Sequence, residues 1–259
     1  MTLELFASNA ALVGGLMTLL WVFSVIRRDA SIVDPWWSMG FLLVAANTAA
    51  RTGLTAGKAL LLVLVGLWAV RLWLHLLLRS RGRPEDPRYA GFRQRFGPAR
   101  YWWVSFFQVF LLQGCLLLLI SAPLQLAAAA AVPDPVTLAD LVGLAAFTVG
   151  LAIEAVADRQ LQAFRNDPSK KGKVLDTGLW GWSRHPNYFG EALLWWGLWA
   201  CSLDQPFGWA TVLSPLLLTF LLLRVSGVTM LDAHMRATRP GYDAYLKRTP
   251  GFIPRRPRS

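Results

Sequence analysis

Residues 58–78 read KALLLVLVGLWAVRLWLHLLL, an almost unbroken apolar run that decides the fold class. A helix needs about 20 mainly apolar residues to cross the hydrocarbon core of a bilayer. Backbone groups in hydrocarbon must be hydrogen-bonded within the chain, and the alternating pattern of a membrane β-barrel is absent, so the run is expected to be helical. Similar apolar runs occur at 4–26, 35–50, 102–122, 137–157, 186–203 and 207–225.

These runs predict an all-α, integral membrane bundle of seven transmembrane helices. The composition agrees, since 55% of the 259 residues are hydrophobic and 16% are charged, whereas soluble domains carry about a quarter charged residues. We therefore expect a single transmembrane domain over 1–259, without a separate soluble domain. Arg27 and Arg28 follow the first run and no basic segment precedes it, which is typical of a retained anchor.

The distribution of Lys and Arg predicts the orientation of the bundle. The chain has 26 Lys and Arg against 15 Asp and Glu, a net charge of +11. The basic residues gather after the first, third, fifth and seventh runs, and the opposite side carries only Arg51 and Lys58. Because basic loops stay in the cytosol, the N-terminus is expected outside and the C-terminus in the cytosol. A bacterial inner membrane is the expected location.

The charge and the cysteines also bear on the partners. In a soluble protein this net charge would suggest nucleic acid, but here topology explains most of it, so no nucleic-acid partner is expected. An anionic cofactor arriving from the cytosol would use the same loops. Cys115 and Cys201 lie in apolar runs and no Cys/His spacing of a metal site occurs, so no metal is expected. Nucleotide motifs of the GxGxxG or Walker type are absent.

Polar residues concentrate next to the membrane in the stretch 154–191, EAVADRQLQAFRNDPSKKGKVLDTGLWGWSRHPNYFGE. Glu154, Asp158 and Arg165 fall on one face of a helix. Ionisable side chains at membrane depth are costly and usually line a cavity. We interpret this face as one wall of a polar site. The alternative is an ion pair at the helix end, between Asp158 and Arg165 or Arg159.

Residues 183–187, SRHPN, open the next helix of this stretch. Proline suits a first helical turn, and the free N–H groups there, with the helix dipole, favour an anion. Arg184 and His185 add side-chain donors, and Lys173 lies in the preceding basic loop. Glu191 lies one turn into the hydrocarbon, where a carboxylate needs a partner or a polar cavity.

Three further segments are expected on the same side of the membrane. Residues 34–37, DPWW, open the second run, residues 81–89, RGRPEDPRY, follow the third, and residues 239–254, RPGYDAYLKRTPGFIP, lie near the C-terminus. Each also has a plainer interpretation. Asp34 would cap a helix, the tryptophans would join the interfacial aromatic belt, and the tail tyrosines would anchor the tail instead of stacking on a base.

These pieces, in this order, resemble the bacterial branch of the steroid 5α-reductase family. The likeness rests on DRQLQAF at 158–164, GLWGWSRHPNYFGE at 178–191, and the segments 81–89 and 239–254. It covers most of the chain and is strongest over the second half. A shorter RHP-x-Y-x-G core also occurs in isoprenylcysteine carboxyl methyltransferases, so that core alone does not separate the two families.

The resemblance implies a seven-helix fold and NADPH-dependent reduction of a carbon–carbon double bond conjugated to a ketone, as in 3-oxo-Δ4 steroids or similar enone lipids. Lys173 replaces an arginine of the family, and Glu154 stands where human members carry an asparagine. The residues suggested for cofactor binding, with their neighbours in the same motifs, are Arg83, Arg88, Tyr89, Glu154, Asp158, Arg165, Lys173, Arg184, His185, Asn187, Tyr188, Glu191, Tyr242 and Tyr245.

The ketone end needs a hydrogen-bond donor where negative charge develops. In the family, an acidic residue on the second helix and a tyrosine on the third lie near that ketone. Asp34 is the candidate acid, because a buried carboxyl can hold its proton near neutral pH. The third run contains no tyrosine, which leaves Trp68, Trp73 or His75 nearby. The candidates for contact with the substrate are Trp36, Trp37 and Trp68.

Two other classes of protein are alternatives to the reductase. A membrane methyltransferase would use S-adenosylmethionine, which carries no phosphate, so the dense basic loops favour the reductase. A small transporter or channel would be expected to show a pair of broken, inverted-repeat helices, and its acidic residues would not cluster near one face. We therefore expect a small hydrophobic substrate from the bilayer and NADPH from the cytosol.

Overall fold

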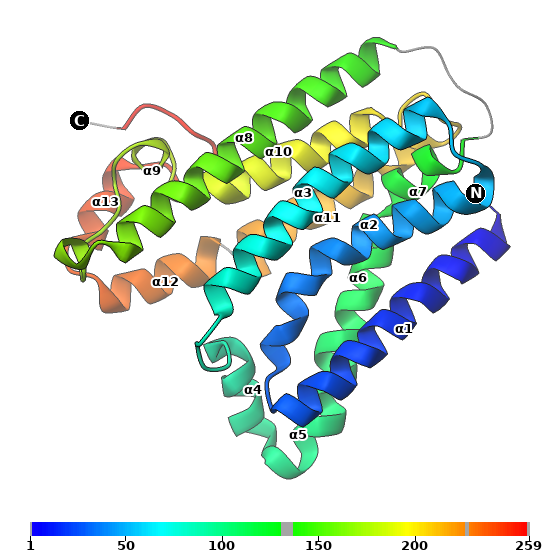
Figure 1. Cartoon of the computed structure of the whole chain (residues 1–259). Coiled ribbons are helices and arrows are strands. Elements are labelled where there is room, and N and C mark those ends of the chain that lie inside the picture. The colour runs from blue at the N-terminus through cyan, green and yellow to red at the C-terminus, as the bar shows by residue number, and fades with distance from the viewer. Residues whose placement is uncertain (1, 131–136, 226–227, 258–259) are drawn as a thin grey trace. The chain divides into compact units, whose positions relative to one another are not determined.

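The computed structural model describes residues 2–130, 137–225 and 228–257. This part of the chain is helical, without strands, as the sequence predicts (Figure 1). The chain forms two compact units, Met1–Pro135 and Val136–Ser259, each with its own packing.

Within the described residues, five helical segments are long and apolar enough to cross a membrane: Leu3–Arg27, Ala56–Ser80, Pro98–Ile120, Leu138–Asn166 and Gly208–Val225. They correspond to five of the predicted runs, and they are those of a multi-pass membrane protein. The other two runs form the helices Val33–Thr52 and Pro186–Ala200, which lie outside this set. The number of seven spans and the orientation of the termini stay predictions.

The first unit contains long helices joined by short connections. In chain order its elements are α1 (Leu3–Arg27), η1 (Ala30–Ile32), α2 (Val33–Thr52), α3 (Ala56–Ser80), α4 (Pro87–Phe96), α5 (Pro98–Ser105), η2 (Phe106–Leu111), α6 (Leu112–Ile120) and α7 (Ala122–Ala128). The π-helical turn η2 joins α5 and α6 into one span. Helix α2 packs against α1 and α3, and its residues Phe41, Val44 and Ala45 are fully buried.

Polar side chains inside the first unit bond to one another, as they must in hydrocarbon. Asn9 on α1 donates to Thr48 Oγ1 on α2 (2.9 Å) and to Gln125 Oε1 on α7 (3.1 Å). Asn47 donates to Asn9 Oδ1 (2.8 Å). The ammonium of Lys58 donates to carbonyl oxygens at the end of α2. These bonds fix α1, α2 and α7 to one another at one end of the unit.

The second unit begins with a helix that is longer than its predicted apolar run. Its elements are α8 (Leu138–Asn166), η3 (Pro168–Lys170), α9 (Leu179–Trp182), α10 (Pro186–Ala200), η4 (Gly208–Val212), α11 (Leu213–Phe220), η5 (Leu221–Val225), α12 (Val228–Thr238) and α13 (Tyr242–Arg248). Helix α8 starts at a capping box of Thr137 and Asp140. Its 29 residues rise about 43 Å, more than the roughly 30 Å of hydrocarbon, so its polar turns extend the helix past the predicted end.

Four glycines let α8 and α10 pack backbone against backbone, side by side in Figure 1. A Cβ atom at Gly150 would lie 2.6 Å from the Gly190 oxygen, and one at Gly190 would lie 2.6 Å from the Glu154 nitrogen. A Cβ at Gly197 would lie 2.5 Å from the Gly143 oxygen. Small residues allow this close approach of helices in membranes. The contact places Glu154 directly beside α10.

Candidate functional site

The first unit brings Asp34 together with two residues of the segment 81–89. Tyr89 donates its hydroxyl to Asp34 Oδ1 (2.6 Å), and Arg88 Nη2 lies 2.7 Å from Asp34 Oδ2. Gln113 Nε2, on α6, donates to the Tyr89 hydroxyl oxygen (3.1 Å). Arg88 and Tyr89, predicted as cofactor ligands, therefore lie against the residue predicted to act at the ketone. No sequence motif pointed to Gln113.

Ion pairs and a helix cap fix the loop between α3 and α4, which leads to Tyr89. Asp86 caps α4, and its Oδ1 accepts from the Arg88 N–H (3.0 Å). Glu85 accepts from the Ala30 N–H (2.8 Å) and pairs with Arg93 through two bonds, of 2.9 and 2.8 Å. Because η1 leads directly into α2, these bonds hold the loop against the first turn of α2.

The hydroxyl of Tyr89 keeps its proton at neutral pH. Only 5% of the residue is exposed. Burial, and then the negative charge of Asp34, raise the pKa of Tyr89 well above its ordinary value. The third predicted helix lacks the tyrosine that the resemblance implies, but a tyrosine from α4 provides a hydroxyl beside the acidic residue.

The tryptophans predicted to contact a substrate lie along α2 and α3. Trp36 packs edge-on against Trp73, with ring centroids 5.6 Å apart, and Trp37 packs in the same way against Phe41 at 4.8 Å. The ring of Trp68 lies 5.8 Å from Phe41 and is fully buried. Trp68 is thus a core residue, whereas Trp36 and Trp37 are half-buried. Contact with a substrate stays a prediction for all three.

In the second unit, buried acidic side chains gather where α8 packs against α10. The exposed fractions of Glu154, Asp158 and Glu191 are 2%, 5% and 9%. Asn187 Nδ2 donates to Asp158 Oδ1 (3.2 Å). The polar face predicted on α8 therefore meets the polar face predicted on α10, and Asp158 has a partner on the neighbouring helix. Arg165 lies exposed in the last turn of α8.

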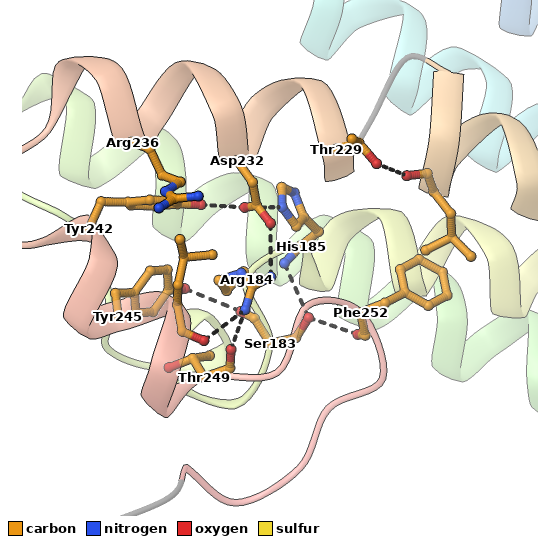
Figure 2. Close-up of polar contacts among 12 residues, drawn as sticks. Ser183, Arg184, His185, Thr229, Asp232, Arg236, Tyr242, Tyr245, Thr249 and Phe252 are labelled. Carbon is orange, nitrogen blue, oxygen red and sulfur yellow. Dashed lines mark hydrogen bonds and ion pairs between the residues drawn. The ribbon is translucent and has the colours of Figure 1, made fainter.

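A carboxylate that no motif indicated, Asp232 on α12, bonds to three predicted site residues (Figure 2). Its Oδ2 lies 2.8 Å from Arg184 Nη2, and its Oδ1 lies 3.0 Å from His185 Nε2. Tyr242 donates its hydroxyl to Oδ1 as well. Burial alone would raise the pKa of Asp232, but the hydrogen bonds from His185, Arg184 and Tyr242 lower it to about 2.

The C-terminal segment is tied to the turn that precedes α10. Arg184 Nη1 donates to the Thr249 oxygen (2.6 Å), and the Arg184 backbone N–H donates to the Pro250 oxygen (2.9 Å). Ser183 Oγ donates to the Phe252 oxygen (2.7 Å), as Figure 2 shows. The guanidinium of Arg184, predicted to bind the cofactor, is therefore hydrogen-bonded within the chain.

The two tail tyrosines anchor this segment. Tyr242 and Tyr245 are 3% and 4% exposed, and their ring centroids lie 5.6 Å apart. Tyr245 donates its hydroxyl to the Trp180 oxygen. Burial raises the pKa of both hydroxyls. These contacts are those expected if the two tyrosines anchor the tail. Stacking on a base stays a prediction. The half-buried Tyr188 stacks on the ring of His185, with centroids 5.7 Å apart.

The remaining predicted cofactor residues are exposed cations. Lys173 is exposed between η3 and α9, next to the exposed Lys171, and Arg83 is exposed between α3 and α4. Over the described ranges, no group of three or more His, Cys, Asp or Glu side chains could hold a metal ion.

Comparison with known proteins identifies a family whose function is unknown. The profile of a family described as "Protein of unknown function (DUF1295)" matches residues 20–249. That family is related to steroid 5α-reductase-like proteins. An uncharacterized protein of Schizosaccharomyces pombe is 27% identical over 206 residues, which cover 68% of this chain and 58% of that protein. The chain therefore spans less than two thirds of the length of this relative.

Proposed function

We propose that this chain, which belongs to the DUF1295 family, is an NADPH-dependent membrane reductase of enone lipids. The bond reduced would be the Δ4 carbon–carbon double bond of a 3-oxo-Δ4 steroid, or its equivalent in a similar conjugated ketone. The observation that carries the proposal is the hydrogen bond of 2.6 Å from the Tyr89 hydroxyl to Asp34. It supplies the pairing of a tyrosine with a carboxyl group that the motif resemblance implies.

At the ketone end, the chemistry needs a hydrogen-bond donor aimed at the ketone oxygen, where negative charge develops during reduction. The sequence predicts Asp34 for this task. Because Arg88 pairs with Asp34 at 2.7 Å, we assign the donor role to Tyr89, and Asp34 holds the Tyr89 hydroxyl in place until the substrate binds. On substrate binding, the ketone oxygen would replace Asp34 Oδ1 as acceptor of the Tyr89 proton. Arg88 would keep the other oxygen of Asp34 paired, and Gln113 would hold the tyrosine oxygen.

The aromatic side chains near this hydroxyl suit a flat, apolar substrate. Trp36 and Trp37 follow Asp34 by two and three residues, and both are half-buried. Large aromatic faces bury much apolar area at a low entropic cost. We therefore propose that Trp36 and Trp37 contact the ring system while Tyr89 holds the ketone.

At the cofactor end, the donor set of the second unit fits NADPH chemically. Exposed cations, among them Arg165, Lys171 and Lys173, match the phosphate groups, and the Coulomb interaction favours the extra 2′-phosphate. The part-buried Asp158–Asn187 pair matches hydroxyl and amide groups. When bound, NADPH would supply the hydride for the β-carbon, and the α-carbon would take the accompanying proton from solvent. The chain's own residues would bind and orient the cofactor and exclude water from it.

A direct assay tests the reductase proposal. The purified full chain in detergent, given progesterone and NADPH, should consume NADPH at 340 nm and form the saturated ketone in equal amount by mass spectrometry. If there is neither saturated product nor NADPH binding, the reductase proposal is wrong. Binding of S-adenosylmethionine in place of NADPH would favour the methyltransferase, which shares the RHP-x-Y-x-G core.

A pair of tyrosine variants tests the donor. Tyr89→Phe should lower kcat about a hundredfold, the usual cost of removing one donor to a developing oxyanion, and leave NADPH affinity unchanged. Tyr101→Phe is the matched control, because the Tyr101 hydroxyl is buried and accepts or donates no hydrogen bond among the described residues. Equal kcat values for the two variants would remove Tyr89 from the mechanism.

A further inference from the structure

The bonds of Asp232 fix which nitrogen of His185 carries a proton. Asp232 pairs with the guanidinium of Arg184 at 2.8 Å and is therefore ionised, and an ionised carboxylate can only accept hydrogen bonds. His185 Nε2, 3.0 Å from Asp232 Oδ1, must therefore be the donor. Within the described part of the chain, no residue bonds to the other ring nitrogen, Nδ1.

The ring of His185 is also fixed in direction. Only 4% of the residue is exposed, and its ring lies nearly parallel to that of Tyr188, with an interplanar angle of 6°. The His185 backbone N–H donates to Ser183 Oγ (3.1 Å). The backbone, the ring face and Nε2 each have a partner, so Nδ1 is the polar atom of this residue that can bind a ligand.

Arg184 has a different task from its neighbour. Nη2 is paired with Asp232 and Nη1 donates to two tail carbonyl groups, those of Leu246 and Thr249. A guanidinium held in this way is not directed at a phosphate. Arg184 therefore links Asp232 to the tail, and the network leaves His185 and Asn187 as the side chains of this turn that can face a cofactor.

We propose that Asp232 is a positioning residue of the cofactor site: it holds His185 as the Nε2-protonated tautomer, so that Nδ1 accepts a hydrogen bond from a hydroxyl or amide group of the dinucleotide. The inference rests on the proposed function, since it concerns the same cofactor. Asp232 lies outside every sequence motif, and His185 acts as an acceptor. The same orienting role is played by carboxylates that bond to histidines in metal sites and catalytic triads.

The tautomer is tested without the cofactor. Protein labelled with ¹⁵N-histidine, in detergent, should show the Nε2–H pattern for His185 in long-range ¹H–¹⁵N correlation spectra, with the signal assigned from its loss in His185→Gln. Asp232→Asn should shift this signal towards a mixture of tautomers. Asp232→Glu keeps the carboxylate and should retain the Nε2–H pattern, and it provides the test if Asp232→Asn does not fold. Loss of the pattern in Asp232→Glu would count against the proposal.

The cofactor contact is tested by titrating the same proteins with NADPH and following tryptophan fluorescence. Asp232→Asn should raise the Kd about tenfold, the effect of losing one well-oriented hydrogen bond. Asp243→Asn is the matched control, because Asp243 pairs with Arg236 on the exposed surface, and its Kd and His185 signal should equal those of the wild type. A wild-type protein that does not bind NADPH would refute the proposed function. If Asp232→Asn keeps the wild-type tautomer of His185, or if Asp232→Asn and Asp243→Asn weaken NADPH binding equally, the positioning role is refuted. The proposed function would still stand.

Discussion

Replacing Gly190 by alanine tests whether the close contact of α8 and α10 builds the polar site of the second unit. The added Cβ would lie 2.6 Å from the Glu154 nitrogen and from the Gly150 oxygen, and ordinary contact begins at 3.4 Å. Both are backbone atoms, so the helices must separate by about 0.8 Å. The bond from Asn187 to Asp158 is 3.2 Å long, and this separation would stretch it to about 4.0 Å, beyond hydrogen-bonding distance.

Overpacking of a close-packed contact costs about 1–3 kcal/mol. We expect Gly190→Ala to lower the free energy of unfolding by this amount, measured by reversible unfolding in mixed detergent and dodecyl sulfate micelles, and to weaken NADPH binding. Gly14→Ala on α1 is the matched control, since nothing lies within 4 Å of its added Cβ. Equal free energies of unfolding for the two variants would refute the reasoning that this backbone contact sets the helix spacing.

Two further predictions concern the second unit. The folded-state pKa of Asp232 is about 2 against an ordinary 3.8, so the stability it contributes is complete above pH 3.8 and is lost as the pH falls towards 2. This loss of about 2 kcal/mol should appear in the free energy of unfolding measured against pH, and it should be absent in Asp232→Asn. An equal loss at low pH in that variant would contradict the prediction. Asp158→Ala should raise the Kd for NADPH about tenfold and leave the melting temperature within a few degrees of wild type, and an unchanged Kd would contradict the cofactor assignment.

The helices could be predicted from the sequence, because the backbone of an apolar run in hydrocarbon must bond within the run, and a helix achieves this. The start of α10 at Pro186 was predicted from the suitability of proline for a first turn. The apolar run predicted for α8 ends at 157, but the polar face with Asp158 and Arg165 predicted that the helix continues, and it ends at Asn166, just before Asp167-Pro168. The pairing of Asp158 with Asn187 follows the two predicted faces, but their mutual distance depends on glycines. Gly143 and Gly150, and likewise Gly190 and Gly197, are seven residues apart, a spacing of small residues that could have been used.

Other parts of the site could not be read from local pattern. The resemblance of the segment 81–89 suggests Tyr89 for the cofactor, whereas its hydroxyl bonds to Asp34, and the pair of Glu85 and Arg93 fixes the segment that leads to it. Asp232 lies 47 residues after His185, on a short helix without a motif. Three side chains bond to the carboxylate of Asp232. Only the folded chain brings them together, so the sequence does not indicate this cluster.

The bonds between the turn at 183–184 and the tail also set an order of events during synthesis. Ser183 bonds to Phe252, 69 residues later, and Arg184 bonds to Thr249, 65 residues later. A ribosome adds about 5–20 residues per second, so the turn at 183–184 is made roughly 3–14 s before its tail partners. Insertion into the membrane and completion of this turn are therefore separate steps in time. Truncation before Thr249 would make that separation permanent, leaving a chain whose apolar helices are inserted but whose turn before α10 stays open.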